Sequence, residues 1–339
     1  MFVAALRADW RPLGARCDRD APVSELSAQI IERTPLLYAD AAPREQDRPA
    51  FVRAASGLVW FEGQLFIIQD DNEFIGIWTP STDGALARGR VVSWSLGPRA
   101  GGRSRFEEQL GNRLDKSDYE ACAIVPTPEG ARLLVLGSGS LPRRELALLL
   151  DPSRRSAAAP THVPVLFDAF RGALGLPAGV SNVEGVNIRD DLIWLYQRGP
   201  EPAAVGFDLE AVLRVLQEGS TSLEHHVVRR IDLGEIDGCP FGLSDLTTWT
   251  RDRALVLAVA ENTSNPVDDG EILGTLVGVM SGEGVSSARL LDEQGAPARV
   301  KAEGIAVDPR DPQHALIVLD ADDPTVPAEL CRVRLSGFD

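Results

Sequence analysis

The chain has 339 residues, is 44% hydrophobic and carries a formal net charge of −16. This length and apolar content are enough to bury a large core, while the acidic balance repels nucleic-acid phosphates and anionic lipids. Neither nucleic acid nor a membrane is therefore expected as a partner. The N-terminal stretch shows no secretory signal, because Arg7 and Asp9 interrupt it. The four cysteines are far apart and suggest free thiols in the cytoplasm.

A pattern of about sixty residues recurs along the chain and organises the prediction. Residues 28–38, AQIIERTPLLY, form the first expected strand, and five repeats then start near residues 55, 119, 183, 243 and 302. The spacings between equivalent positions are 64, 64, 60 and 59 residues, measured along Ser56, Glu120, Glu184, Ser244 and Glu303. Each start is followed by a turn and then by a short, nearly continuous apolar run such as QLFIIQDD or ALIVLDADD. Such runs are typical of strands buried on both faces.

A third strand and usually a fourth complete each repeat, as FIGIWTP and RVVSWSL do in the first and HVPVLFD in the second. Four antiparallel strands per unit are typical of a β-propeller blade. The sequence therefore predicts an all-β, single-domain propeller of five four-stranded blades. A six-bladed ring is the alternative, in which the first segment would hold a whole blade. In the five-bladed ring, residues 1–54 supply the outer strand that the last repeat lacks and so close the ring.

Two segments interrupt the strand pattern. DLEAVLRVLQEG predicts a short helix with Asp208 as its N-cap and Gly219 just beyond its end. Residues 101–117, GGRSRFEEQLGNRLDKS, form a long polar excursion that is expected to overhang the ring like a lid.

Oxygen-rich side chains lie where the first strand of each repeat begins and where the second ends. In an antiparallel pair these two points share one edge, so the side chains should converge on one mouth of the central channel. The candidate metal ligands are Glu120, Glu184 and Glu303. The candidate ligand-binding residues are Asp70, Asp118, Asn182, Arg198, Asp245, Asn262, Lys301 and Asp320. Clustered carboxylates raise one another's pKa or need a counter-charge, and an oxygen-only set without histidine favours Ca²⁺ or Mg²⁺ over zinc or iron.

The same glutamates also suit a purely structural role. A carboxylate at the head of an inner strand can accept hydrogen bonds from the next blade or pair with Arg198 or Lys301. The following glycine lets crowded inner strands pass one another. The residue pattern leaves metal binding and blade-to-blade pairing open.

Three stretches resemble the blades of bacterial propellers of the SdiA-regulated and phytase-like (esterase-like phytase) type. They are DKSDYEACAIVPTPEGARLLVLGSGS, SNVEGVNIRDDLIWLYQRG and KAEGIAVDPRDPQHALIVLDADD, in which a D/N-x-E-G/A motif opens successive blades. The resemblance runs from about Ala55 to the C-terminus. It implies a calcium ion held by carboxylates in the channel, where the ion polarises a phosphate or ester and activates water. It also implies Glu120, Glu184 and Glu303 as ligands, with Asp118 and Asn182 beside them.

Two hypotheses for function follow. In the first, the protein is a calcium-dependent phosphate-ester or ester hydrolase of phytase, esterase or lactonase type. It binds a small polar or anionic molecule, and Lys301 or Arg198 acts as the catalytic residue that neutralises the leaving anion. In the second, it is a non-catalytic sensor or scaffold propeller that binds a ligand or a protein at its rim.

Overall fold

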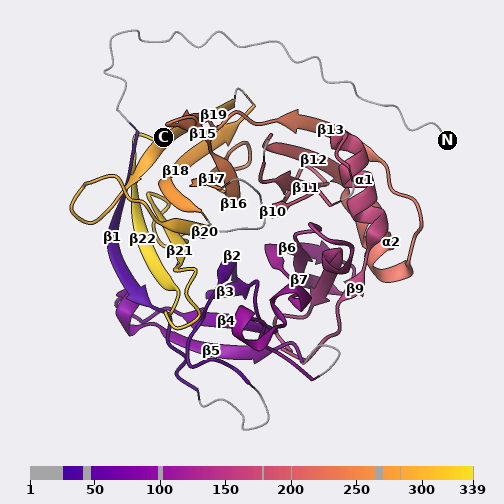
Figure 1. Ribbon diagram of the computed structural model, residues 1–339, viewed down its shortest axis with the longest axis horizontal. Helices are drawn as coiled ribbons and strands as arrows, with labels where there is room; N and C mark the ends of the chain where they lie inside the picture. Colours follow the sequence, from indigo (N-terminus) through magenta and orange to yellow (C-terminus); the bar gives the residue numbers. More distant parts are fainter. Residues whose placement is uncertain are drawn as a thin grey trace, which may run out of the picture.

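The strands of the protein form sheets that stand around a central axis in a β-propeller-like ring (Figure 1). The computed structural model describes residues 26–40, 47–97, 102–177, 179–199, 201–263, 270–282 and 284–338. Five inner strands surround the axis, and each contacts the next until the last returns to the first. In ring order they are β2 (Ala55–Phe61), β6 (Tyr119–Thr127), β10 (Val183–Arg189), β16 (Gly242–Thr248) and β20 (Lys301–Val307).

Three of these inner strands each begin a four-stranded antiparallel sheet. The first sheet continues with β3 (Gln64–Gln69), β4 (Phe74–Thr79) and β5 (Arg90–Ser95). The second continues with β7 (Gly130–Gly137), β8 (Leu146–Leu150) and β9 (Thr161–His162). The third continues with β11 (Leu192–Gln197), β12 (Ala203–Asp208) and β13 (His225–Arg230).

The other two inner strands belong to one eight-stranded sheet, in the order β16-β17-β18-β19-β1-β22-β21-β20. Its further members are β17 (Ala254–Asn262), β18 (Glu271–Ser281), β19 (Gly284–Leu291), β1 (Ser27–Pro35), β21 (His314–Asp320) and β22 (Glu329–Ser336). The N-terminal strand β1 pairs antiparallel with β22, the last strand of the chain, as the sequence predicts. It also pairs parallel with β19, over two residue pairs. This parallel contact merges two four-stranded units, so the count of five blades stays a prediction.

The apolar core lies between successive sheets. Between the first and second sheets, for example, Phe66 and Ile77 pack with Tyr119 and Val135. Because apolar side chains from both faces of each inner sheet are buried in this way, the continuous apolar runs of the sequence become strands covered on both sides. Stability therefore comes from sheet-to-sheet packing all around the ring.

Two helices lie outside the third sheet (Figure 1). The helix α2 (Leu209–Glu218) is confirmed: the Asp208 side chain accepts the Ala211 N–H at 2.8 Å, and Gly219 has a φ of 70°. The helix α1 (Pro164–Leu174) corrects the prediction that HVPVLFD is a strand. Pro164 suits the first helical turn, and the apolar residues Leu166, Phe167 and Phe170 are all fully buried.

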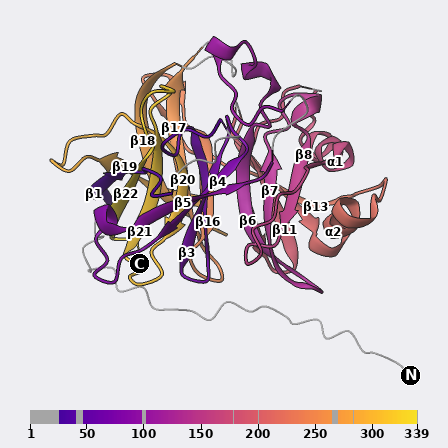
Figure 2. The same ribbon diagram turned by 90° about the horizontal axis from the view of Figure 1, so that it is seen from below.

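The polar excursion is attached to the first sheet at its beginning. The Glu73 N–H donates to the Ser104 carbonyl and the Phe106 N–H to the Asp71 carbonyl, both at 2.8 Å. The excursion then forms two short 3₁₀ turns, Glu108–Leu110 and Arg113–Asp115, which rise from one face of the ring (purple in Figure 2).

A small sheet of β14 (Glu235–Ile236) and β15 (Cys239–Pro240) precedes β16. Two further 3₁₀ turns, Leu86–Arg88 and Pro142–Arg144, lie between β4 and β5 and between β7 and β8. No helix in the described ranges combines the length and the hydropathy that a membrane crossing requires.

Candidate functional site at the channel mouth

A β-bulge marks the beginning of each of the five inner strands. In every case the pairing register shifts by one residue, and the extra residue is the one that the repeat alignment selects. These residues are Ser56, Glu120, Glu184, Ser244 and Glu303. A bulge leaves its extra residue outside the ladder and redirects its side chain. The repeat therefore places one redirected side chain per inner strand at the same level of the ring.

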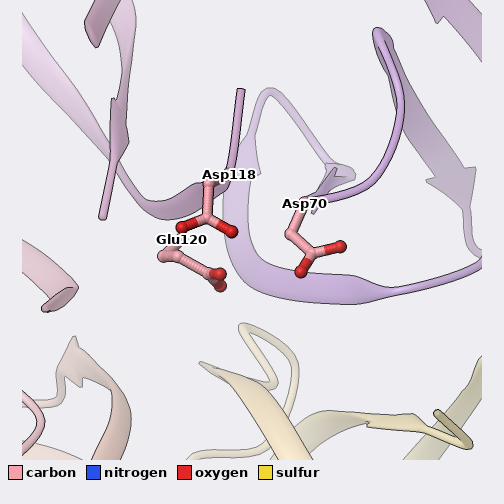
Figure 3. A group of neighbouring side chains, drawn as sticks. All are labelled: Asp70, Asp118 and Glu120. Carbon is pink, nitrogen blue, oxygen red and sulfur yellow. The ribbon is translucent and has the colours of Figure 1, made fainter. Parts of the chain in front are cut away.

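Three carboxylates form a tight group at one side of this mouth (Figure 3). Asp70 follows β3, while Asp118 and Glu120 lie at the start of β6; one oxygen of each lies within 4.8 Å of the others. Asp118 adopts a φ of 57°, which is unusual for a residue with a side chain. Its carboxylate accepts hydrogen bonds from Ser138 Oγ and, at 2.9 Å, from Arg144 Nη1. The second sheet thus holds Asp118 in a fixed orientation.

Lys116 provides the nearest positive charge to this group. Its ammonium contacts Asp70 and lies 2.7 Å from Asp118 Oδ1. Burial raises the pKa of Asp118, but the charges of Lys116 and Arg144 lower it by more than burial raises it. The pKa of Asp118 therefore lies below the usual value. Glu120 forms no hydrogen bond or ion pair with the described part of the chain. Burial, followed by the charges of Glu184 and Asp118, raises its pKa well above the usual value.

Arg198 is the centre of a second group, which joins neighbouring sheets. Its guanidinium lies 3.6 Å from Glu184 Oε1, 3.5 Å from Glu303 Oε2 and 3.1 Å from Glu261 Oε2. Glu184 also accepts a hydrogen bond of 2.6 Å from Asn182 Nδ2. Burial raises the pKa of Glu184 to about 8, although Arg198 lowers it. Two of the three predicted metal ligands, Glu184 and Glu303, thus lie near one guanidinium. The alternative structural role for these glutamates predicts this pairing.

Lys301 links the same region to the last sheet. Its ammonium lies 2.5 Å from Asp322 Oδ1 and 3.8 Å from Glu303 Oε1. Burial raises the pKa of Asp320 well above its usual value, although Lys301 lowers it. Asn262 lies exposed at the end of β17, where its backbone pairs with Glu271.

Asp245 is occupied by the backbone around it. It is 3% exposed, and its carboxylate accepts N–H groups from Leu246 at 2.7 Å and from Ile305 of β20 at 2.8 Å. A further backbone hydrogen bond comes from Leu58 of β2. These contacts tie β16 to β20 and β2, so its oxygens serve the ring rather than the mouth.

Replacing Asp245 by alanine is expected to lower the free energy of unfolding by about 2–3 kcal/mol, because buried N–H groups lose their acceptors. Asparagine keeps one acceptor oxygen and should restore part of the loss. Urea denaturation of the two variants checks this. Equal stability of the alanine variant and the parent would contradict the role assigned to this carboxylate.

Lys116, Glu261 and Asp322 complete the groups described above. Glu261 lies near the end of β17 and Asp322 just after β21, so both belong to the second-strand ends where the sequence predicts oxygen-rich side chains. The sequence does not indicate with which residues they pair. Lys116 lies directly before the blade-opening motif, at the end of the polar excursion.

The structure thus presents a β-propeller-like protein with a charged channel mouth. The chain belongs to a family of unknown function, DUF6929, which matches residues 51–335. No family match names the SdiA-regulated or phytase-like propellers, so that part of the resemblance stays unconfirmed. No curated protein matches the chain.

Several solved structures are similar to this chain. Glutaminyl cyclase of Myxococcus xanthus is 12% identical, with a TM-score of 0.46, over 92% of this chain and 97% of its own. The PQQ-bound aldose sugar dehydrogenase of Streptomyces coelicolor is 11% identical, with a TM-score of 0.38, over 93% of this chain and 100% of its own. These likenesses are too distant to carry an argument about activity.

Proposed function

We propose that this protein is a five-bladed propeller whose channel mouth binds a divalent cation together with a small polar or anionic molecule. The observation that supports this most directly is the group of Asp70, Asp118 and Glu120, in which one oxygen of each lies within 4.8 Å of the others. Five blades follow if the eight-stranded sheet is two blades in contact through β1 and β19, which share two residue pairs. The acidic charge and the free cysteines described here support a cytoplasmic protein that avoids nucleic acid and membranes.

The donor set fits a hard cation, because all three ligand side chains are carboxylates. Asp70, Asp118 and Glu120 would hold the ion, and calcium is the first candidate. When bound, such an ion supplies Lewis-acid polarisation of a phosphate or ester. The chain's own contribution is orientation: Ser138 and Arg144 hold the Asp118 carboxylate in place.

The finer proposal is hydrolysis of a phosphate ester or ester. Arg198 and Lys301 are the cations at the mouth that would neutralise the leaving anion, since both lie within 4 Å of Glu303. This role requires that each cation exchange a carboxylate partner for the product anion.

The second candidate function is a non-catalytic sensor or scaffold that binds a ligand or a protein at its rim. The pairing of Arg198 with Glu184, Glu261 and Glu303 favours it. A guanidinium shared by three carboxylates joins the sheets and leaves these groups little freedom for chemistry.

Calcium is expected to raise the melting temperature of the wild-type protein, because a ligand that binds only the folded state stabilises it. At a concentration of 100 times its dissociation constant, the gain is about 2.7 kcal/mol. Differential scanning fluorimetry with and without millimolar calcium measures this shift. The Asp118→Asn variant should lose most of the shift, whereas Glu293→Gln, a change at an exposed carboxylate, should keep it. No shift, together with no metal retained on purification without chelator, would contradict the cation site.

A further inference from the structure

Both lysines of this chain lie at the channel mouth. Lysine and arginine together number 34, yet only Lys116 and Lys301 are lysines. Lys116 pairs with Asp70 and Asp118, and Lys301 with Asp322 and Glu303. An ammonium is a compact point charge on a flexible stem, whereas a guanidinium is broad and planar. The chain therefore carries its compact cations where carboxylates converge.

The Lys116 ammonium uses the oxygens that a metal ion would need. Its Nζ lies 2.7 Å from Asp118 Oδ1 and contacts Asp70 Oδ2. A calcium ion bound to the same oxygens would lie 2.3–2.6 Å from each. The ion and the ammonium would then be at most about 5 Å apart and would repel each other strongly. The calcium ion and the Lys116 ammonium therefore cannot both bind tightly to Asp70 and Asp118.

With Arg144 paired to Asp118, the ammonium still leaves one of the three carboxylates without a cationic partner in the ranges that the structure describes. Asp70 Oδ1 is buried and has no hydrogen-bond partner among the described residues. Glu120, the third member of the group, has no hydrogen-bond or ion-pair partner there either. A divalent ion would supply more charge and would reach all three carboxylates.

Lys116 ends a segment of largely exposed residues. Asn112 ties this segment to Glu107 and Arg105 through two hydrogen bonds. The two 3₁₀ turns before it carry Leu110 and Leu114, which are 38% and 59% exposed. The backbone N–H of Lys116 makes one long hydrogen bond of 3.4 Å, to the Arg113 carbonyl. Segments with little buried apolar surface open readily. The beginning of the excursion is held separately, by Arg53 and its partners Asp71 and Glu107.

We propose that Lys116 is a built-in competitor of the divalent cation: its ammonium holds Asp70 and Asp118 in the cation-free protein and leaves when the cation binds. This inference rests on the proposed cation site. Cation binding is then coupled to release of the Lys116 side chain from the channel mouth. Lys301 stays in place, because its partner Asp322 is not a member of the cation group.

Amine acetylation tests the release directly, since the chain has only two lysines. Wild-type protein is treated with an N-hydroxysuccinimide acetate, with and without calcium, and peptide mass spectrometry gives the rate at each lysine. Calcium should raise the rate at Lys116 at least about tenfold, because its side chain, 15% exposed in the cation-free protein, becomes accessible to the reagent once the ammonium leaves the two carboxylates. The rate at Lys301 should change little. Equal increases at both lysines would indicate general opening and overturn the inference.

Calorimetric titration with calcium tests the competition. The Lys116→Gln variant should bind calcium at least about tenfold more tightly, because the competing charge is gone. Arg88→Gln, which removes a positive charge from a side chain 69% exposed, is the matched control and should bind as the wild type does. If the glutamine variant does not fold, the acetylation of the wild type decides alone.

The outcomes separate the two proposals. If the wild type binds calcium while Lys116 stays protected and Lys116→Gln binds no more tightly, the competition is overturned and the cation site stands. If neither protein binds calcium, the cation site itself fails, and the competition fails with it.

Discussion

Replacing Arg198 by glutamine is expected to lower the free energy of unfolding by about 3 kcal/mol, the lower end of the range for breaking a buried ion pair. The side chain is 18% exposed and is the common partner of Glu184, Glu261 and Glu303. Without the guanidinium these buried carboxyl groups lose their shared charged partner, and those that are ionised repel one another. Because the groups come from β10, β17 and β20, the loss weakens contacts between neighbouring parts of the ring.

The Arg198→Lys variant separates charge from shape. A lysine keeps the positive charge but has one compact ammonium, which cannot face three carboxylates as a planar guanidinium does. We expect it to recover about half of the stability lost in the glutamine variant. Guanidinium chloride denaturation of both variants gives the comparison. If the free energy of unfolding of the glutamine variant lies within about 0.5 kcal/mol of the wild-type value, the ion pairs of Arg198 do not stabilise the fold. Many exposed ion pairs behave in this way.

The repeat was visible in the sequence because each inner strand starts in the same way and is followed by an apolar run of similar length. The bulge residues lie at equivalent positions of these starts, so alignment alone selected them. The closing strand was predictable as well, since the last repeat lacked one strand and residues 28–38 have strand character. The helix α1 was not, because a short apolar run such as HVPVLFD fits a strand or a buried helix equally well.

The grouping of side chains at the mouth depended on information that the sequence lacks. The order of residues along the chain predicts that Glu120, Glu184 and Glu303 lie at one level of the ring. It does not show which of them the side chains of Arg198 and Lys116 contact. Arg198 reaches across sheets to Glu184 and Glu303. Glu120 lies instead with Asp70 and Asp118. The two groups therefore differ in which cationic side chain extends to them, and position in the repeat does not determine this.

The Glu184→Gln variant is expected to be more stable than the wild type at alkaline pH and to lose this advantage as the pH falls. Burial raises the pKa of Glu184 from 4.5 to about 8. The folded state therefore holds this proton over a pH range in which the unfolded state has released it. The contribution of this group to wild-type stability must then fall as the pH rises from about 5 to about 8. The full shift corresponds to at most about 5 kcal/mol, and glutamine, which cannot ionise, removes this part of the pH dependence.

The difference between the two unfolding curves reports the Glu184 carboxyl group and the groups that its charge affects. Glu120, Asp245 and Asp320 also have raised pKa values and are present in both proteins. Their effects cancel except for the part of the Glu120 and Asp245 shifts that the charge of Glu184 causes. Glutamine keeps an amide oxygen that can accept the hydrogen bond from Asn182, which limits other changes. Glu201→Gln, at a side chain 77% exposed, should follow the wild-type curve. Parallel curves for Glu184→Gln and wild type between about pH 5 and pH 8 would mean that Arg198 keeps Glu184 ionised in the folded protein.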